Sequence, residues 1–235
     1  MDEFHIGGRK ASVEFLDQLG LTAESQVLDV GCGLGGPARF AASRYRSQVT
    51  GIDLTSEFVD TGNTLCTWVG LDSCVTLRQG SALEMPFPDS SFDSAYMIHV
   101  GMNIADKETL ALEVARVLRP GSLFGIYDVM QTGPGELVYP LPWATRPDLS
   151  AVASPERYKA ALQAAGYDIV AERNRRDFAL TFFADLRAKT AAASGPPPLG
   201  LHLLTGESTL EKAANMIENI SKGRIAPVEV VARRR

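Results

Sequence analysis

Residues 27–36 read Val-Leu-Asp-Val-Gly-Cys-Gly-Leu-Gly-Gly, and residues 49–53 read Val-Thr-Gly-Ile-Asp. In the first stretch an apolar run leads into a glycine-rich turn, and the second stretch ends in an acid, Asp53. Glycine carries no Cβ, so such a turn bends sharply and lets a ligand approach the backbone closely. This order is typical of a βαβ site for an adenosine-type cofactor: a strand, a glycine turn, a helix and a second strand. The second strand of such a site ends in an acid roughly twenty residues after the first glycine. We therefore predict a nucleotide site in which Asp53 accepts hydrogen bonds from the ribose hydroxyls.

Asp29 bears on which nucleotide this turn binds. Gly31, Gly33 and Gly36 satisfy the pattern G-x-G-x-x-G, which allows a dinucleotide. A dinucleotide would place its pyrophosphate on the N-terminus of the following helix, close to the Asp29 carboxylate. Because like charges repel, that carboxylate favours a cofactor that carries an ammonium and a sulfonium group instead.

Composition limits the class of protein. The chain has 235 residues, 45% of them hydrophobic and 22% charged, which is ordinary for a globular protein with one substantial core. The net charge of −5 argues against nucleic acid as the main partner. No apolar run reaches the length of a membrane span, and no secretory signal is recognisable. The three cysteines have no metal-type spacing, so we expect a reduced, cytoplasmic protein that binds no metal.

Short apolar runs alternate with amphipathic segments along most of the chain. We predict strands over residues 26–30, 48–53, 75–79, 94–99, 123–129, 167–172 and 228–232. We predict helices over residues 10–19, 38–46, 55–69, 106–118, 155–165, 178–193 and 208–223. This order indicates an α/β protein with a doubly wound, mostly parallel seven-stranded sheet.

The segment 131–154 interrupts the alternation with prolines, glycines and two large aromatic residues, Tyr139 and Trp143. An insertion of this composition after a strand is typical of a cap over a substrate site. Residues 195–198, Gly-Pro-Pro-Pro, predict a turn rather than a domain linker. We therefore expect one domain over residues 1–235, with a cofactor-binding core at about 20–130 and a cap formed by 131–154 and 178–223.

The pattern Asp-x-Gly-x-Gly-x-Gly that begins at Asp29 resembles motif I of the class I S-adenosylmethionine-dependent methyltransferases. The resemblance covers roughly residues 26–130 and implies a Rossmann-like methyltransferase sheet. Residues 85–89 and 92–93, Met-Pro-Phe-Pro-Asp and Phe-Asp, resemble the "LPF…D…FD" segment before the fourth strand. Residues 116–122, Arg-Val-Leu-Arg-Pro-Gly-Ser, resemble the "RVLKPGG" turn before the fifth.

Both of these later motifs are typical of the ubiquinone/menaquinone-biosynthesis and sarcosine/dimethylglycine methyltransferase-like branch, whose members methylate small molecules. Residues 4–8, Phe-His-Ile-Gly-Gly, also look like a lead-in of the sarcosine-type group. Where many relatives carry Gly-Asp-Ala after the third strand, this chain has Ser81 in place of the acid, so its contact with adenine carries no charge. The resemblance implies that S-adenosylmethionine is held by Asp29, Gly31, Cys32, Gly33, Gly35, Asp53, Leu54, Ser81, Ala82 and His99.

Methyl transfer is an in-line displacement that needs positioning more than covalent help. Ligands of open α/β sheets bind at the carboxyl ends of the strands. That edge brings His99 and Asp128 near the transferring methyl as catalytic candidates. The alternatives are a structural His99 whose backbone carbonyl faces the cofactor, and an Asp128 that only supports a loop.

Asn103, Tyr139 and Trp143 are the candidates for binding the acceptor. Their alternatives are a turn at Asn103 and cap packing for the two aromatics. For the loop residue His5 we expect no partner, although closure over the methionine end of the cofactor is open to it. Residues 173–176 and 233–235 contain arginines that we interpret as a solvated rim.

The function that these features predict is methyl transfer from S-adenosylmethionine to a nitrogen or oxygen atom of a small-molecule acceptor. Two alternatives stay open: an NAD-dependent oxidoreductase, and a protein that binds S-adenosylmethionine without catalysis. No nucleic-acid or membrane partner is expected, and the sequence sets no oligomeric state.

Overall fold

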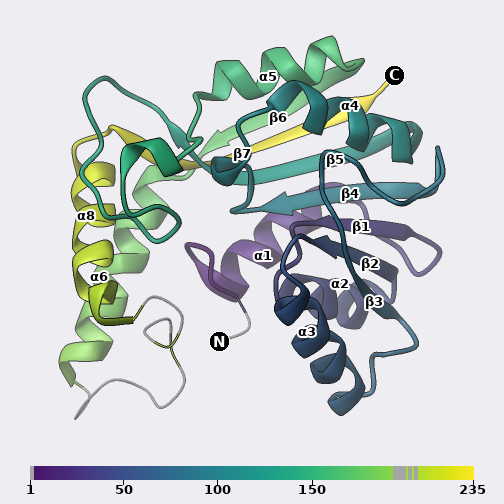
Figure 1. Cartoon of the computed structure of the whole chain (residues 1–235), viewed down its shortest axis with the longest axis horizontal. Coiled ribbons are helices and arrows are strands. Elements are labelled where there is room, and N and C mark those ends of the chain that lie inside the picture. The colour runs from purple at the N-terminus through teal and green to yellow at the C-terminus, as the bar shows by residue number, and fades with distance from the viewer. Residues whose placement is uncertain (1–2, 193–199, 201–202, 204–205) are drawn as a thin grey trace.

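A seven-stranded sheet with the order β3-β2-β1-β4-β5-β7-β6 forms the centre of the molecule (Figure 1). The computed structural model describes residues 3–192, 200, 203 and 206–235. The first five strands pair in parallel, and β7 pairs antiparallel with both β5 and β6. The strands are β1 (Gln26–Val30), β2 (Gln48–Asp53), β3 (Val75–Gln79), β4 (Phe92–Ile98), β5 (Leu118–Gln131), β6 (Tyr167–Asn174) and β7 (Ile225–Arg234). The predicted mostly parallel, seven-stranded α/β sheet is confirmed.

Helices cover both faces of this sheet, with α1, α2 and α3 on one side and α4 and α5 on the other (Figure 1). Helices α6 and α8 form a separate lobe beyond one end of the sheet, at the left of Figure 1. The α-helices are α1 (Gly8–Leu16), α2 (Gly36–Tyr45), α3 (Ser56–Trp68), α4 (Lys107–Val117), α5 (Pro155–Ala164), α6 (Arg176–Ala192) and α8 (Thr209–Ser221). Short 3-10 turns are η1 (Asp17–Leu19), η2 (Gly101–Asn103), η3 (Pro147–Leu149) and η4 (Gly206–Ser208).

Burial on both faces explains why the strands could be recognised from sequence. In β1 the side chains of Val27, Leu28 and Val30 are completely buried, because helices cover the sheet on each side. Parallel strands in this position are near-continuous apolar runs rather than alternating ones. Asp29 is the single polar residue within that apolar run, which makes its environment important for the site described below.

The strand before the cap begins earlier than predicted. The Pro-Gly pair at 120–121 does not delay β5, because Leu118 already pairs with Phe92 of β4. A register shift between Phe92 and Ser94 accommodates the turn within the ladder. Strand β4 ends at Ile98 and not at 99 as predicted, so His99 lies directly after the strand and not within it.

Hydrogen bonds to the backbone hold the 131–154 segment of the cap against α8 and against the loop after β4. Asn219 of α8 holds the backbone of Val138, donating to its carbonyl at 2.9 Å and accepting from its amide at 3.0 Å. Near the other end of the cap, the amide of Ala151 donates to the Met102 carbonyl at 2.8 Å. The buried Lys107 donates to the Ala151 carbonyl at 2.9 Å. The predicted turn at 195–198 lies outside the described residues.

Candidate active site

The glycine turn follows β1 and is hydrogen-bonded to the carboxyl end of β2. The amides of Gly31 and Cys32 both donate to the Ile52 carbonyl, at 2.8 and 3.0 Å. Gly31 has a φ of 75°, and a Cβ at this position would overlap the Val100 side chain, so only glycine fits. A Cβ at Gly33 would meet nothing within 4 Å, so this side of the turn is open. The turn therefore presents bare backbone at the edge of the sheet where a ligand is expected.

Asp53 lies beside this open backbone. Its Oδ2 accepts from the Gly33 amide at 2.8 Å, and its Oδ1 accepts from the Thr55 amide at 3.0 Å. A carboxylate has about four acceptor positions, so both oxygens can still accept hydroxyl groups. The next residue, Leu54, is 72% exposed, which makes an apolar platform next to the acid. The loop after β3 is tied to this pair, because the Gly80 amide donates to the Asp53 carbonyl at 2.9 Å.

The predicted adenine-binding residues lie in that same loop. Ser81 and Ala82 are half-buried, and the Ser81 hydroxyl accepts from the Leu83 amide at 3.1 Å. Ser81 is thus engaged in shaping its own turn, and its second lone pair and its proton remain for a ligand. The structure brings together Gly33, Asp53, Leu54, Ser81 and Ala82, as expected for neighbouring parallel strands.

Asp29 differs from the simple expectation of a fixed negative charge. The side chain is only 2% exposed, and the Tyr96 hydroxyl donates to its Oδ2 at 3.1 Å. Burial raises the pKa of Asp29 to about 8, against the effect of the Tyr96 bond, and the nearby Asp53 raises it further. The carboxyl group is therefore mostly protonated at neutral pH, because desolvation disfavours the ionised form. Asp29 attracts a cationic ligand only after its carboxyl group has lost this proton.

Cys32 contributes its backbone and not its thiol. The side chain is buried, and burial raises the pKa of the thiol far above its ordinary value. It packs against Gly51 of β2, where a Cβ would come within 2.7 Å of the Cys32 Sγ. A thiol held neutral in this way fills the space under the turn and is not a nucleophile.

The two predicted catalytic residues lie on opposite faces of the sheet. The His99 ring packs 5.0 Å from the ring of Tyr127, whereas Asp128 accepts from the Tyr158 hydroxyl of α5 at 2.5 Å. Successive residues of a strand point to opposite faces, so Tyr127 and Asp128 separate their partners. Asp128 is completely buried, which raises its pKa to about 6. Its Oδ2 also lies against Gly101, where a Cβ would come within 2.6 Å of it, so the structure favours the alternative for Asp128, that of an acid supporting the loop after β4.

His99 is placed where its side chain faces the N-terminal segment. Its φ is 55°, and its Nε2 is buried with no hydrogen-bond partner among the described residues. Burial and the neighbouring His5 keep the pKa of His99 well below its ordinary value, so the ring is neutral. A buried ring nitrogen that lacks a partner is costly, and a polar group of a ligand or a water molecule would offset this.

His5 is the residue that the sequence interpretation placed wrongly. We expected a loop residue without a partner, but His5 is buried and its Nε2 contacts the Gly8 carbonyl at 3.1 Å and the Ser12 Oγ at 3.0 Å. Its ring lies 5.9 Å from that of His99 and 6.1 Å from that of Tyr127. The N-terminal segment therefore runs across the carboxyl edge of β4 and β5.

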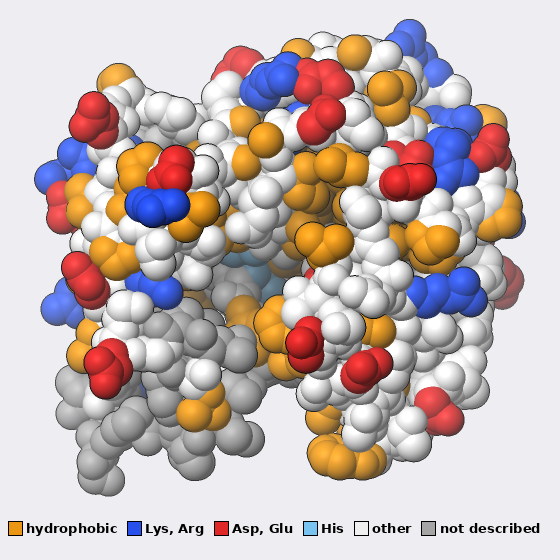
Figure 2. All heavy atoms as spheres, viewed as in Figure 1, with side chains coloured by type: hydrophobic (Ala, Val, Ile, Leu, Met, Phe, Trp, Pro, Cys, Tyr) orange, Lys and Arg blue, Asp and Glu red, His pale blue; other side chains and the backbone are white. Residues whose placement is uncertain are grey.

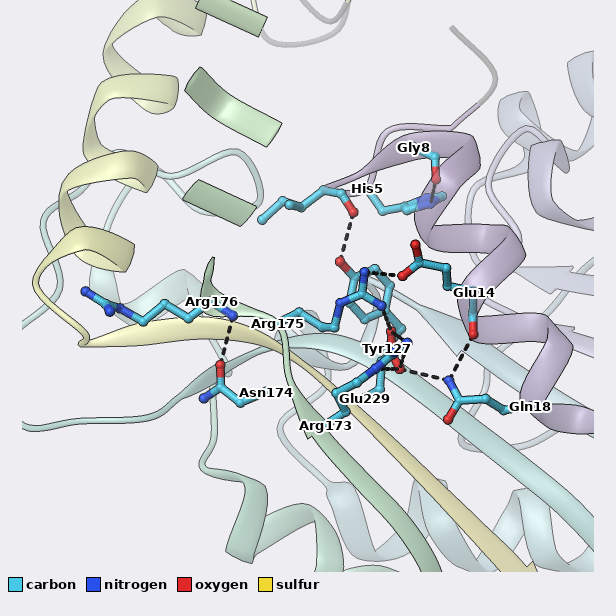
Figure 3. Close-up of polar contacts among 11 residues, drawn as sticks. His5, Gly8, Glu14, Gln18, Tyr127, Arg173, Asn174, Arg175, Arg176 and Glu229 are labelled. Atoms are coloured by element: carbon cyan, nitrogen blue, oxygen red, sulfur yellow. Dashed lines mark hydrogen bonds and ion pairs between the residues drawn. The ribbon is translucent and has the colours of Figure 1, made fainter. Parts of the chain in front are cut away.

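Arg175 departs from the solvated rim that we predicted for the arginines of 173–176 and 233–235, because it is buried in an ion cluster, whereas Arg173, Arg233 and Arg235 are exposed. Arg175 is 5% exposed and pairs with Glu14 of α1 at 2.6 Å and with Glu229 of β7 at 2.7 Å (Figure 3). Arg173 pairs with the same Glu229, which is 1% exposed, and Gln18 donates to it at 2.8 Å. The cluster fastens α1 to the strands at the far side of the sheet.

The predicted acceptor-binding residues are divided between turn and cap. Asn103 is exposed, and its Nδ2 donates to the Val100 carbonyl at 3.2 Å, which favours its role in a turn. Tyr139 and Trp143 are half-buried against the apolar cluster of the cap, and Trp143 donates to the Ser150 hydroxyl at 3.0 Å. The space-filling view shows a hollow between the lobe of α6 and α8 and the body of the protein, with a histidine on its floor (Figure 2).

Two further findings concern what the site and its surroundings contain. Within the described ranges, no group of three His, Cys, Asp or Glu side chains lies close enough to hold a metal ion. No helix in the described part of the chain is both long and apolar enough to cross a membrane.

The strand order, the antiparallel β7 and the acid at the end of β2 define the fold of class I S-adenosylmethionine-dependent methyltransferases. Comparison with known proteins agrees. Residues 28–126 match the family described as the methyltransferase domain. Residues 28–126 are thus similar to a methyltransferase domain, and the solved structures of this fold include complexes with S-adenosylmethionine.

Individual relatives match the same part of the chain. A sterol 24-C-methyltransferase of Gibberella zeae is 37% identical over 114 residues, which are 48% of this chain and 30% of the relative. A probable chloroplastic tocopherol O-methyltransferase of Oryza sativa is 42% identical over 96 residues, 41% of this chain and 26% of the relative. The chain thus spans less than a third of the length of these relatives.

One solved structure extends the likeness of fold to almost the whole chain. The phosphoethanolamine N-methyltransferase 2 of Haemonchus contortus, in complex with S-adenosyl-L-methionine, superposes with a TM-score of 0.83 at 20% sequence identity. The superposition covers 99% of this chain and 54% of the other. At this level of identity the comparison speaks for the fold alone.

Proposed function

We propose that this protein transfers the methyl group of S-adenosylmethionine to a nitrogen or oxygen atom of a small-molecule acceptor bound under the cap. The observation that carries the proposal is the group formed by Gly33, Asp53 and the exposed Leu54 at the carboxyl edge of β1 and β2. An open backbone, a carboxylate with acceptor positions left and an apolar platform next to it are what a nucleoside requires.

Each of these residues has a definite task in the proposal. Asp53 accepts from the two ribose hydroxyls, and the adenine ring lies over Leu54 with Ser81 and Ala82 at its edge. The Gly31–Gly35 turn lets the methionine end pass close to the backbone, with Asp29 beneath it. When bound, the cofactor supplies a methyl group on a sulfonium sulfur, whose departure as a neutral thioether needs no acid.

The chain's contribution to the reaction is to bind both reactants, hold them in line and exclude water. The acceptor lies between the carboxyl ends of β4 and β5 and the apolar cap, next to the neutral ring of His99. Tyr139 and Trp143 present half-buried aromatic surface on that side. The names of the sterol and tocopherol relatives support a small-molecule acceptor, and we place this chain in the ubiquinone/menaquinone and sarcosine-like branch on its motifs.

The first test is calorimetric titration of the protein with S-adenosylmethionine, S-adenosylhomocysteine and NAD. We expect both sulfur compounds to bind and NAD to give no heat. Asp53→Ala should weaken binding of the sulfur compounds at least about 10-fold, since a hydrogen bond to a charged group contributes about 1.5–3 kcal/mol. Asp60→Ala, which removes an exposed acid on α3, is the matched control and should bind as wild type.

Methyl transfer itself is measured with labelled S-adenosylmethionine and a panel of hydroxylated and amine-containing small molecules. Labelled product that depends on both Asp53 and an acceptor supports the proposal. Binding of NAD in place of the sulfur compounds would return the chain to the oxidoreductases. Tight binding with no labelled product from any acceptor class would leave a protein that binds the cofactor without catalysis.

A further inference from the structure

The hydrogen bonds of His5 fix which of its ring nitrogens carries the proton. Nε2 lies 3.1 Å from the Gly8 carbonyl oxygen, which only accepts, and 3.0 Å from the Ser12 Oγ. The Ser12 hydroxyl donates its one proton to Glu3 at 3.0 Å, so towards His5 it is also an acceptor. Both partners therefore require a proton on Nε2. In the neutral ring this leaves the lone pair on Nδ1.

That Nδ1 lone pair has no hydrogen-bond partner among the described residues, although the other side of the ring is fully engaged. Burial lowers the pKa of His5 to about 4, so the ring stays neutral at physiological pH. The ring lies 5.9 Å from that of His99, which follows β4 at the carboxyl edge of the sheet. A free acceptor is thus held next to the position where the proposed reaction takes place.

The segment that carries His5 is held in place by the rest of the molecule. The Tyr127 hydroxyl donates to the Ile6 carbonyl at 2.9 Å (Figure 3). Gly7 packs directly on the Phe178 ring of α6, where a Cβ would overlap that ring. The helix that follows is fastened by Glu14 to the buried Arg175. These contacts give His5 one orientation, as a group that must position a substrate requires.

The surroundings indicate the kind of nucleophile. The cap side is apolar, with half-buried Leu137, Tyr139, Trp143, Val152, Phe182 and Phe183 packed on its core. Both His5 and His99 are neutral, and Asp29 is mostly protonated at neutral pH. The carboxylate nearest to His5, that of Glu3, is already engaged by Ser12 and by Arg9. A hydroxyl on an apolar skeleton therefore matches an unpaired acceptor in an apolar wall better than a cationic amine does.

We infer that His5 binds the methyl acceptor through Nδ1, which accepts a hydrogen bond from a nucleophilic hydroxyl group on a largely apolar skeleton. This inference rests on the proposed function and narrows it to oxygen. As the O–CH₃ bond forms, the S–CH₃ bond breaks and its electron pair stays on the thioether sulfur. The hydroxyl proton passes to Nδ1 and from the imidazolium to water, so no other reactant is needed.

The tautomer can be measured directly with ¹⁵N-labelled protein and long-range ¹H–¹⁵N spectra of the three histidines, assigned with His5→Gln. We expect Nε2–H and a bare Nδ1 in the free protein and in the complex with S-adenosylhomocysteine. Adding 2-naphthol as the hydroxyl probe to that complex should shift the Nδ1 resonance towards that of a hydrogen-bonded nitrogen. An Nδ1–H tautomer, or an Nδ1 signal that saturating 2-naphthol does not move, overturns the inference.

Two variants separate this role from a structural one. The amide nitrogen of His5→Gln takes the place of Nε2–H and keeps the bonds to Gly8 and Ser12, but it removes the acceptor. His5→Asn places an amide oxygen near the position of Nδ1. If His5 were only structural, the Gln variant would behave as wild type. We expect 2-naphthol to bind His5→Gln about 10-fold more weakly and His5→Asn nearly as tightly as wild type.

Both variants should bind S-adenosylhomocysteine as wild type does, which shows that the site is folded. Wild-type binding of 2-naphthol by His5→Gln, or no binding of 2-naphthol to the wild-type complex, contradicts the inference and leaves the proposed function standing. Failure of the wild type to bind S-adenosylhomocysteine at all contradicts the proposed function instead.

Discussion

Asp29 shows how a single buried acid alters the reasoning from sequence. The spacing of Asp29 from Gly31 predicts a carboxylate beside the cofactor, but the side chain is 2% exposed and its pKa is raised to about 8. The position of the Asp29 side chain could be predicted from the motif, because the motif fixes the backbone. The charge of Asp29 could not be predicted, because it depends on how completely α-helices on both faces cover β1. Here the folded protein binds a proton that the unfolded chain releases.

This proton makes stability depend on pH. The pKa of Asp29 rises from an ordinary 3.8 to about 8 on folding, so between these values the folded state binds more protons than the unfolded state. The free energy of unfolding must therefore fall as pH rises through this window, by up to about 1.4 kcal/mol per pH unit. Asp29→Asn, which cannot ionise, should become more stable relative to wild type as pH increases from 5 to 8.

Urea denaturation of wild type and Asp29→Asn at three pH values within this range measures the difference. Asp60→Asn serves as the control, since that acid is exposed on α3 and should leave the pH profile of wild type unchanged. Parallel profiles for wild type and Asp29→Asn would show that Asp29 is ionised in the folded protein.

At the scale of elements, the N-terminal helix and the last two strands are joined by charge. Arg175, directly before α6, reaches Glu14 across 161 residues of sequence and Glu229 across 54. Nothing in the local pattern of residues 173–176 distinguishes this cluster from an exposed basic run. Such contacts depend on which strands the topology places side by side. They therefore cannot be predicted from the local spacing of residues.

Arg175→Ala should destabilise the protein by about 3 kcal/mol or more. Removal of one partner from a buried ion pair leaves the other charge without full compensation, and this typically costs about 3–5 kcal/mol. Arg173 still reaches Glu229, which places the expected value at the lower end of that range. Thermal or urea denaturation gives the value, and Arg187→Ala on the exposed side of α6 should change it by less than about 0.5 kcal/mol.

At the scale of the whole molecule, the sheet could be predicted and the attachment of the cap could not. Each predicted strand overlaps an observed one. The central strands were recognisable because helices bury both faces and leave a continuous apolar run, whereas the edge strands β3 and β6 are partly exposed and contain polar residues. The meeting of Gly33, Asp53 and Ser81 follows from parallel strands that end at one edge. The cap instead depends on Asn219 and Lys107, polar residues whose partners are backbone carbonyls and amides. Because a backbone group is the same in nearly every residue, such hydrogen bonds cannot be predicted from the types of residue in the sequence.

Lys107 is the clearest case for a test of the cap. It is 2% exposed and donates to the carbonyls of Gly101, Ile104 and Ala151, so it joins the loop after β4 to the end of the cap. Lys107→Met keeps the apolar stem and removes these bonds. We expect a loss of about 1–3 kcal/mol in unfolding free energy and faster hydrogen exchange at the Ala151 amide.

Lys189→Met, on the exposed surface of α6, is the matched control for loss of a lysine charge. Unchanged exchange at Ala151 in Lys107→Met would mean that the hydrogen bond from the Ala151 amide to the Met102 carbonyl is enough to hold this end of the cap.

The protonated state of Asp29 has a consequence for repeated turnover under the proposed function. Substrate and product forms of the cofactor differ by one positive charge on sulfur, and a protonated Asp29 offers no counter-charge by which to tell them apart. The spent thioether should therefore compete with fresh cofactor on nearly equal terms. Catalysis would then slow as product accumulates, and the pace of methylation in a cell would follow the ratio of the two compounds. Alkaline conditions, which ionise Asp29, should relieve this inhibition.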